Sequence, residues 1–493
     1  MSDTRITSPA EAAVAAPVPR PAARPAPHPV LTPLGLFTVL VGAALPMVDF
    51  FIVNVALPAI DHDLHAGPAL LEMVVGGYGV AYAVLLVLGG RLGDTVGRRR
   101  LFLWGTAAFG VTSVACGLAP GAWELVVARI AQGAASALML PQVLATIQAT
   151  TSGAARARAL SFYSGTAGVA ASVGQVLGGV LVAADVAGSG WRSIFLVNAP
   201  VAAVALLLAG RAVPETRSAR PTRVDGLGTV LLSLSLVSLL VPLTEGRATG
   251  WPVWSWVLLA VFPFAAVAFA VTERRLERSG GEGRAPLVPP SLLRVRSVRT
   301  GLAVLVPFSL GWGGFMFVLA VVLQEGLRLG PLAAGLSLLP MCVTFFAGSL
   351  AGPRLFGRYG RRAVTAGALV QGAGLLAVAA AFHRGWEAAD LWGPCVALAV
   401  QGLGQGLLLP LTLRTVLSEV PVAQAGVGSG VMVTTQQSFM ALGVATLGSL
   451  FLSLSDAVGM RDALAVTLGV QLVTVVATVL LTLRLPRGMT DRY

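Results

Sequence analysis

The sequence contains no lysine, so all 34 of its basic residues are arginine. A nucleotide-binding loop of the form G-x-x-x-x-G-K-[ST] needs that lysine, and we therefore expect no nucleotide partner. Histidine is scarce, at 4 residues in 493, and the three cysteines fit no metal-site spacing. Because an enzyme would need clustered histidine, cysteine or carboxylate groups, these shortages argue against catalytic residues, a metal site and a cofactor.

Charge of either sign is also scarce, at 11% of residues, whereas 56% are hydrophobic. A soluble domain carries about a quarter charged residues. The apolar residues form blocks whose length matches the ~30 Å hydrocarbon layer of a bilayer. The net charge of +12 could suggest a nucleic-acid partner. However, the arginines lie in short gaps between apolar blocks, which is typical of a membrane protein and excludes that interpretation.

The apolar blocks predict fourteen membrane-spanning helices, because a lipid-exposed segment must satisfy its own backbone hydrogen bonds. The alternating ten-residue strands of a membrane barrel are absent. The predicted spans are 33–58, 70–92, 101–120, 123–146, 160–183, 193–212, 226–244, 253–272, 300–324, 331–354, 363–383, 391–413, 427–452 and 463–484.

The distribution of arginine predicts the orientation of these spans. With both termini in the cytoplasm, 28 of the 34 arginines fall on the cytoplasmic side and 5 outside, and Arg129 lies within a span. This is the positive-inside bias of multi-pass proteins. The all-arginine usage, together with abundant Ala, Gly, Val and Leu, indicates a GC-rich bacterial genome. We therefore expect a bacterial cytoplasmic membrane protein, and no cleavable signal peptide because the first apolar block begins late.

The two halves of the chain repeat. GGRLGDTVGRRR at 89–100 matches GPRLFGRYGRR at 352–362, and Gln132-Gly133 precedes Pro141 by the interval that separates Gln401-Gly402 from Pro410. Internal repeats around a midplane site are common in secondary transporters. The predicted organisation is a disordered cytoplasmic tail at 1–32, a six-helix bundle at 33–212, a linker with two inserted helices at 213–272, a cytoplasmic loop at 273–299, a second six-helix bundle at 300–485 and a cytoplasmic tail at 486–493.

Two ionisable residues stand inside apolar spans. Asp49 lies in PMVDFFIVNVALPAI and Arg129 in LVVARIAQGAASALMLP. A charge at that depth is costly, so each is a candidate functional residue. Asp49 could bind a proton or cation, or it could be a structural acid that bonds a neighbouring helix. Arg129 could pair with Asp49 in one state and release it in another, or it could simply fix two helices together. Gln132, one turn on, could extend the cluster.

The loop after the second span predicts a conformational latch. Asp94 ends the span and is followed by Arg98 and Arg99, so its carboxylate could cap a neighbouring helix end, where the helix dipole favours negative charge. A solvated, positive-inside loop is the alternative. The candidate residues of this latch are Gly90, Asp94, Gly97, Arg98 and Arg99.

A substrate cavity should be mostly apolar with few polar anchors. Gln175 could line such a cavity, and Gln436 and Gln437 could bond either a substrate or another helix. The candidate cavity residues are Phe50, Phe51, Gln132, Gln175, Trp312, Gln436 and Gln437. The expected partners are then a small-molecule substrate, protons and the lipid bilayer.

With these motifs in place, residues 33–485 resemble the fourteen-helix drug:proton antiporters of the major facilitator superfamily. Residues 90–100 match the loop motif G-x-L-x-D-x-x-G-R-R, 49–58 resemble the first-helix motif and 125–137 the fourth-helix motif. The resemblance implies an all-α integral membrane protein with the major facilitator fold, two six-helix repeats plus two inserted helices. It implies proton coupling through Asp49 and Arg129, and a lock on one alternating-access state through Asp94.

Three positions depart from the family pattern. Phe51 stands where the first-helix motif has threonine, Gln175 where the fifth-helix antiporter motif has proline, and Gly357 where the second half would repeat Asp94. The spans 331–354 and 427–452 also lack acids that favour cationic drugs. The leading hypothesis is export of small amphipathic compounds in exchange for protons. Symport, transport of one dedicated metabolite, and a receptor or scaffold without transport remain alternatives.

Overall fold

The computed structural model of the chain describes residues 30–217, 225–246, 249–279, 286–386, 392–421 and 424–484. Within these ranges every regular element is helical. The tail predicted at 1–32 lies outside the described residues except for its last three positions, and the tail predicted at 486–493 lies outside them entirely.

The first half of the chain begins with five long helices that follow one another closely. They are α1 (Pro33–Leu64), α2 (Gly67–Val96), α3 (Arg98–Gly117), α4 (Ala122–Thr150) and α5 (Gly153–Ala184), followed by the short α6 (Ser193–Leu196) and by α7 (Asn198–Ala212). The inserted pair is α8 (Gly226–Glu245) and α9 (Val253–Ser279).

The second half repeats this order. After the short α10 (Pro290–Arg294) come α11 (Arg296–Val321), α12 (Pro331–Ser337), α13 (Leu339–Tyr359), α14 (Arg361–Gly385), α15 (Trp392–Leu417), α16 (Ala425–Gly443), α17 (Ser449–Val458) and α18 (Met460–Leu483). Single π-helical turns extend α11 over Val322–Gly326 and join α16 to α17 over Val444–Gly448.

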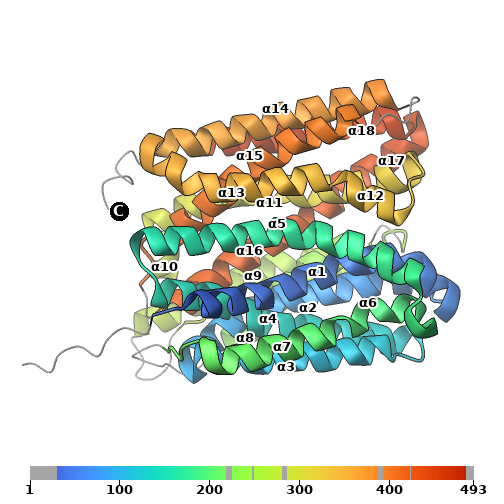
Figure 1. The fold of residues 1–493 in the computed structure, drawn as a ribbon. Helices are drawn as coiled ribbons and strands as arrows, with labels where there is room; N and C mark the ends of the chain where they lie inside the picture. The colour runs from blue at the N-terminus through green and yellow to red at the C-terminus, as the bar shows by residue number, and fades with distance from the viewer. Residues whose placement is uncertain are drawn as a thin grey trace, which may run out of the picture.

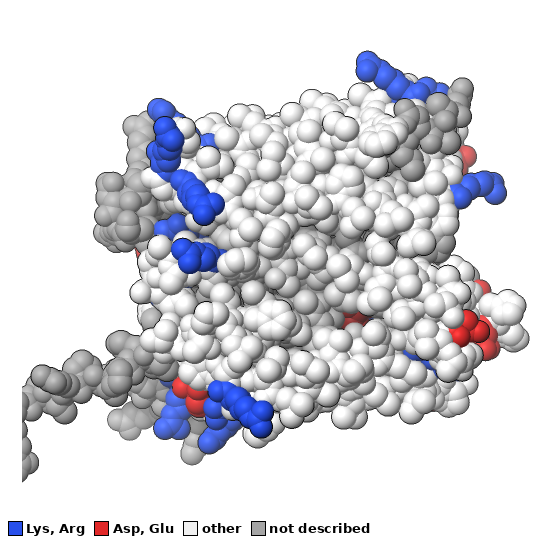
Figure 2. Space-filling view, in the orientation of Figure 1, with Lys and Arg blue, Asp and Glu red and all other residues white. Residues whose placement is uncertain are grey.

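Thirteen helical stretches in the described part of the chain are long and apolar enough to cross a membrane. The remaining predicted span, 101–120, corresponds to α3, whose first three residues are arginines. This helix packs along α4 and α7 as a full member of the bundle. Arginine side chains gather at the two ends of the molecule, and the belt between them is nearly uncharged on the face that Figure 2 shows. The prediction of an all-helical, multi-spanning protein is confirmed.

The helices form two bundles that lie side by side (Figure 1). In the first, α4 packs against α2 and α3, α1 against α5, and α3 against α7; in the second, α15 packs against α13 and α14, α11 against α16, and α14 against α18. The halves meet where α2 packs on α16 and α5 on α13. The inserted helices α8 and α9 pair with each other, and α8 attaches the pair to α2. The buried apolar residues of both halves form one continuous cluster, and a smaller second cluster lies within the first half.

Several helices run beyond the apolar spans predicted for them. The helix α1 continues through Pro58 to Leu64, α5 starts at Gly153 rather than near residue 160, and α9 runs on to Ser279 into the predicted loop 273–299. The apolar run ends where the lipid ends, whereas backbone hydrogen bonding continues through polar turns outside it. The structure therefore places the arginines at the start of α5 on a helix.

Candidate functional site

The two buried ionisable residues of the first half form an ion pair. Asp49 lies in the middle of α1 and Arg129 in α4, and these helices contact each other. Arg129 Nη1 lies 2.5 Å from Asp49 Oδ2, and both side chains are 0% exposed. Removing one partner would leave an uncompensated buried charge, which typically costs about 3–5 kcal/mol. The pair therefore holds α1 and α4 together while both groups are ionised.

Two amides complete the coordination of the Asp49 carboxylate. Gln132 Nε2 donates to Asp49 Oδ1 at 2.9 Å, and Asn198 Nδ2 donates to the same oxygen at 2.7 Å. Asn198, at the start of α7, also donates to Ser113 Oγ on α3 at 3.0 Å. Hydrogen bonds to a carboxylate favour its charged form. The negative charge of Asp49 is thus supported from α4 and α7 as well as by the arginine.

Arg129 is held from a third helix, α2. Its Nε donates to the Val74 carbonyl oxygen at 3.1 Å, and its guanidinium carbon lies 4.2 Å from the centre of the Tyr78 ring. A cation over an aromatic face is stabilised by the ring, more strongly when water is excluded. The Tyr78 hydroxyl is itself fixed at 2.9 Å from Ser136 Oγ. The arginine therefore keeps a stable position that does not depend on Asp49 alone.

This arrangement permits a proton-dependent change of partners. Arg129 Nη1 also donates to Gln132 Oε1 at 2.8 Å. If Asp49 takes up a proton, the ion pair is lost, but Arg129 retains Gln132, the Val74 carbonyl group and Tyr78. Arg129 Nη2 has no hydrogen-bond partner among the described residues, so a neutral Asp49 would leave the buried guanidinium charge with these neutral partners alone. Whether the cluster couples protons to transport stays a prediction.

The predicted latch residue Asp94 lies where the two halves meet. Its Oδ1 accepts hydrogen bonds from Arg98 Nη2 at 2.8 Å and from the Gly426 amide nitrogen at 3.2 Å, and its Oδ2 accepts from the Val427 amide nitrogen at 3.3 Å. Gly426 and Val427 belong to the first turn of α16, in the second half of the chain. A carboxylate there complements the positive end of the helix dipole. Its role as a latch stays a prediction.

Two glycines near this loop have a structural reason: Gly90 lets α2 approach α16 closely, and Gly97 adopts an unusual backbone angle. A side chain at Gly90 would collide with the backbone of Gly426 on α16. Gly97 has φ of 121°, a conformation that residues with a side chain rarely adopt. Next to it, Glu215 Oε1 accepts from the Arg99 amide nitrogen at 3.2 Å. These contacts fix the turn that points Arg98 at Asp94.

The candidate cavity residues do not form one group. Gln132 is 0% exposed and bonds to Asp49, and its contact with a substrate stays a prediction. Trp312 lies buried in the second half, stacked on Phe345 with ring centres 6.0 Å apart. Phe50 and Phe51 pack edge to face on α1.

The remaining candidates lie on helices at the interface between the halves. Gln175 is on α5, and Gln436 and Gln437 are on α16. Gln175 and Gln436 are nearly buried, whereas Gln437 is partly exposed, next to Tyr82 on α2. Gln437 therefore remains the best-placed polar candidate for substrate contact, and that contact stays a prediction.

Three members of the Asp49 cluster escaped sequence reasoning. Asn198, Ser113 and Tyr78 lie in apolar runs on α7, α3 and α2, and none carries a charge that would draw attention. The one signal in the sequence that could have indicated this cluster is Asn198, an asparagine within an otherwise apolar stretch. Its partner lies 149 positions away in the chain. Sequence spacing alone cannot connect them.

Comparisons with known proteins give a consistent result. The sequence profile of the Major Facilitator Superfamily matches residues 39–226 and 220–444. The chain is 37% identical over 418 residues to a probable actinorhodin transporter of Streptomyces coelicolor, covering 84% of this chain and 72% of that protein. It is 31% identical over 428 residues to a tetracenomycin C resistance and export protein of Streptomyces glaucescens, covering 85% and 76%.

Among solved structures, the human organic anion transporter MFSD10 (TETRAN) aligns with a TM-score of 0.64 at 16% identity, covering 91% of this chain and 100% of that one. That likeness concerns the fold. The family profile and the relatives agree with this fold. The chain belongs to the major facilitator superfamily of membrane transporters.

Proposed function

We propose that this transporter exports small amphipathic compounds across a bacterial cytoplasmic membrane, in exchange for protons and by alternating access. The observation that carries the proposal is the enclosed Asp49–Arg129 pair, a fully buried acid–arginine pair that joins α1 to α4. An ionisable acid inside the membrane, whose arginine partner keeps hydrogen bonds to Gln132 and to the Val74 carbonyl group, suits proton exchange. Both termini are assigned to the cytoplasm, because that orientation places most arginines inside.

The proposed direction of transport and the proposed substrate class rest on the names of the relatives. One is a resistance and export protein and another a probable transporter of actinorhodin. The aromatic side chains around Phe50, Phe51 and Tyr78 favour an apolar or amphipathic solute over a highly hydrated one. A narrower second candidate is a transporter dedicated to one natural product, which the names of these relatives favour.

In the proposed cycle, protonation of Asp49 from the outside breaks its ion pair with Arg129. The loosened contact between α1 and α4 lets the first half move relative to the second, and the Asp94 contact with α16 opens. Release of the proton to the cytoplasm restores the pair. A ligand or proton can only shift such an equilibrium by as much as it favours one state over the other.

Proteoliposomes with an acidic lumen test the proposal. Purified protein is reconstituted, candidate dyes and antibiotics are added one at a time, and lumenal pH is followed with a trapped indicator. Antiport predicts proton release that requires both a transported compound and Asp49. The Asp49→Asn variant should still fold and bind compound but release no protons. The control is Asp63→Asn, since Asp63 pairs with Arg192 near the outer end of α1.

Each outcome has a clear meaning. Proton release by wild type and Asp63→Asn, but not by Asp49→Asn, supports the proposal. Equal release by Asp49→Asn removes Asp49 from the coupling mechanism. Uptake of protons together with the compound would favour symport, and a response to only one natural product would favour the narrower candidate.

A further inference from the structure

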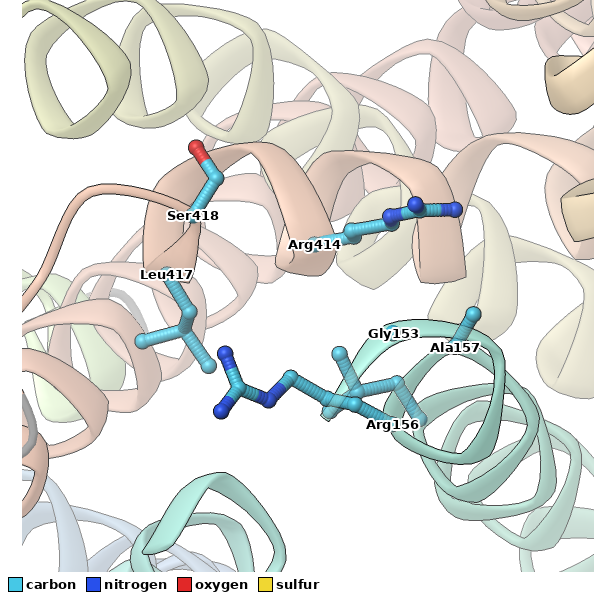
Figure 3. A pocket seen from close by; sticks show the side chains of 7 residues that line it. Gly153, Arg156, Ala157, Arg414, Leu417 and Ser418 are labelled. Atoms are coloured by element: carbon cyan, nitrogen blue, oxygen red, sulfur yellow. The ribbon is translucent and has the colours of Figure 1, made fainter. Parts of the chain in front are cut away.

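The two halves are in close contact at the end of the molecule that holds Asp94. Near the Asp94 contact, Gln148 Nε2 on α4 donates across the interface to the Leu417 carbonyl oxygen at 3.2 Å and to the Val420 carbonyl oxygen at 3.1 Å. Leu417, on the last turn of α15, points toward the first turns of α5 (Figure 3). The halves are therefore joined at this end, and any group that strengthens the contact opposes their separation.

The inserted helices reach the same end of the molecule through the short segment that precedes α10. Arg91 on α2 donates to two carbonyl oxygens of this segment, those of Pro286 and Leu287. From α9, Glu273 Oε2 accepts a hydrogen bond from the Val288 amide nitrogen at 2.8 Å. The segment therefore joins α9 to the last turns of α2, which also carry the predicted latch.

Glu273 faces a second acid, and both side chains are buried. Glu273 is 1% exposed, and Asp225, the N-cap residue of α8, is 9% exposed. A side-chain carbon added to Gly228 would lie 2.4 Å from Glu273 Oε1 and 2.4 Å from Asp225 Oδ2. The two carboxylate oxygens are therefore near neighbours, and the glycine in the first turn of α8 leaves the space in which they approach each other.

The two carboxyl groups have different surroundings. Asp225 Oδ1 accepts from the Leu227 amide nitrogen at 3.2 Å and its Oδ2 from the Gly228 amide nitrogen at 3.0 Å, where the start of a helix favours negative charge. Glu273 Oε1 has no hydrogen-bond partner among the described residues. Arg91, the cation near this pair on α2, donates to backbone carbonyl groups. A proton on Glu273 Oε1 would supply the missing hydrogen bond, with Asp225 as its acceptor.

Two carboxylates that share one site rarely ionise together, because like charges repel each other, and one of them then keeps a proton. We propose that Glu273 binds a regulatory proton, which it shares with Asp225, and that this proton fastens the inserted helices to α2 beside the contact between the two halves. When the proton leaves, two buried negative charges face each other between α8 and α9, and the fastening loosens. Asp94, the other acid near Arg91, is already paired with Arg98.

This proton makes the contact between the halves sensitive to pH. Low pH on this side of the membrane, which the proposed orientation makes the cytoplasm, fastens the inserted helices and opposes the separation of the halves. High pH releases them and favours separation. A ligand shifts such an equilibrium only by as much as it favours one state, and here the proton favours the joined state.

Thermal unfolding across a pH series tests the proton site in the purified full-length protein in detergent. Glu273→Gln keeps the shape of the side chain but cannot ionise, and its amide nitrogen can donate to Asp225 at every pH. A proton that the folded protein binds more tightly than the unfolded chain makes wild-type stability fall as the pH rises. We expect Glu273→Gln to match wild type at about pH 5.5 and to unfold about 2 °C higher than wild type at about pH 8.5.

Two further variants separate a bound proton from a packing role. Asp225→Asn should lose the same pH dependence, because asparagine caps a helix as well as aspartate does but carries no charge toward Glu273. Glu277→Gln is the matched control, since Glu277 lies one turn further along α9 and accepts from the Ser291 amide nitrogen at 3.0 Å. This control should follow wild type at every pH. If Glu273→Gln also follows wild type, or is destabilised equally at every pH, the proposal is wrong.

Pulsed electron-spin distance measurements test the regulatory effect. Spin labels at Ala154 on α5 and Arg358 on α13 report the separation of the halves, because both positions are exposed and lie near this end. The population at longer distance should rise about threefold between about pH 5.5 and about pH 8.5 in wild type and stay constant in Glu273→Gln. A wild-type population that does not change with pH would overturn the regulatory role. Neither measurement needs a substrate or a proton gradient, so both are independent of the proton exchange proposed for Asp49.

Discussion

At the scale of single residues, the proposed switching role of the Asp49 cluster rests on the number of its hydrogen-bond partners. Desolvating two charges costs several kcal/mol per ion, and a well-packed apolar pair is often equally stable. The structure satisfies the carboxylate with three side-chain donors and gives the arginine a carbonyl group and an aromatic ring as well. Such redundancy lets one contact open while the others hold.

Asn198 offers a direct test of this redundancy. It donates to Asp49 Oδ1 at 2.7 Å, and a bond to an ionised group is worth about 1.5 kcal/mol or more. Without it the charged carboxylate is less favoured, so Asn198→Ala should move the midpoint of the pH–transport profile to higher pH by about one unit. The measurement is the initial rate of transport in proteoliposomes across a pH series.

The matched control for this variant is Asn54→Ala. Asn54 lies on the same helix as Asp49 but, among the described residues, donates to the Phe50 carbonyl oxygen and not to Asp49. Its profile should coincide with that of the wild type. A uniform loss of rate in Asn198→Ala with an unchanged midpoint would mean that Asn198 only supports the packing of α7.

The sequence could predict the charged members of this cluster but not the neutral ones. Asp49 and Arg129 stand out because ionisable groups are rare inside apolar runs. Asn198 and Tyr78 do not, because uncharged polar residues are tolerated throughout membrane helices. Their recruitment depends on how α2 and α7 pack against α1 and α4, which is a property of the tertiary structure.

At the scale of helices, the contact of α2 with α16 includes one acid that bonds to the end of α16. The Asp94 carboxylate accepts from two amide groups of α16, whereas the matching position in the second half is Gly357, which has no acid to offer. Asp94→Ala should therefore weaken the contact between the two halves at this end of the molecule. The expected result is about a tenfold lower turnover with nearly unchanged compound affinity, since charged hydrogen bonds are worth about 1.5–3 kcal/mol.

Turnover in proteoliposomes and equilibrium binding of a fluorescent compound separate the two effects. Asp63→Ala is a suitable control, because Asp63 pairs with Arg192 inside one half and does not join the halves. Normal turnover in Asp94→Ala would contradict the latch, and a parallel loss of affinity would show that Asp94 shapes the binding site instead.

The same helix pair provides a steric test. At Gly90 a side chain would meet the Gly426 backbone of α16, so Gly90→Val should push α2 and α16 apart and lower the unfolding temperature. Overpacking of this kind costs about 1–3 kcal/mol. Gly210→Val is the control, because nothing lies within 4 Å of the corresponding position on α7. Equal stability of the two variants would show that α2 and α16 can separate without cost.

The helices themselves were predictable, and their ends were not. Each of the fourteen apolar blocks corresponds to a helix or to a pair of helices joined end to end. The π-helical turns at Val322–Gly326 and Val444–Gly448 have no signature in the apolar pattern. They depend on local packing, for instance of Leu447 against α11, which a hydropathy profile does not record.

At the scale of the whole molecule, the inserted helices are attached to the latch region rather than lying loosely beside it. Arg91 on α2 donates to the carbonyl oxygens of Pro286 and Leu287 in the segment that leads to α10. Glu273 on α9 accepts from the Val288 amide nitrogen at 2.8 Å. The segment between the halves is thus fixed to α2 about one turn from Asp94.

The two halves share a fold but differ in chemistry. The repeat that equates Gln132 with Gln401 also equates Arg129 with Leu398. Gln132 bonds both Asp49 and Arg129, whereas neither polar atom of the buried Gln401 amide has a hydrogen-bond partner among the described residues. An unpaired buried polar group costs about 1–3 kcal/mol. The same substitution should therefore have opposite effects at the two positions.

Gln132→Leu should lower the unfolding temperature and abolish proton-coupled transport, because it removes a donor to Asp49 and an acceptor for Arg129. Gln401→Leu should leave the unfolding temperature unchanged or raise it, because leucine has no polar atoms to satisfy. Thermal unfolding and proton release by the two variants, prepared in parallel, check this asymmetry. A comparable loss of stability and coupling in Gln401→Leu would show that the second half carries a polar function of its own, and proton coupling could then no longer be assigned to the first half alone.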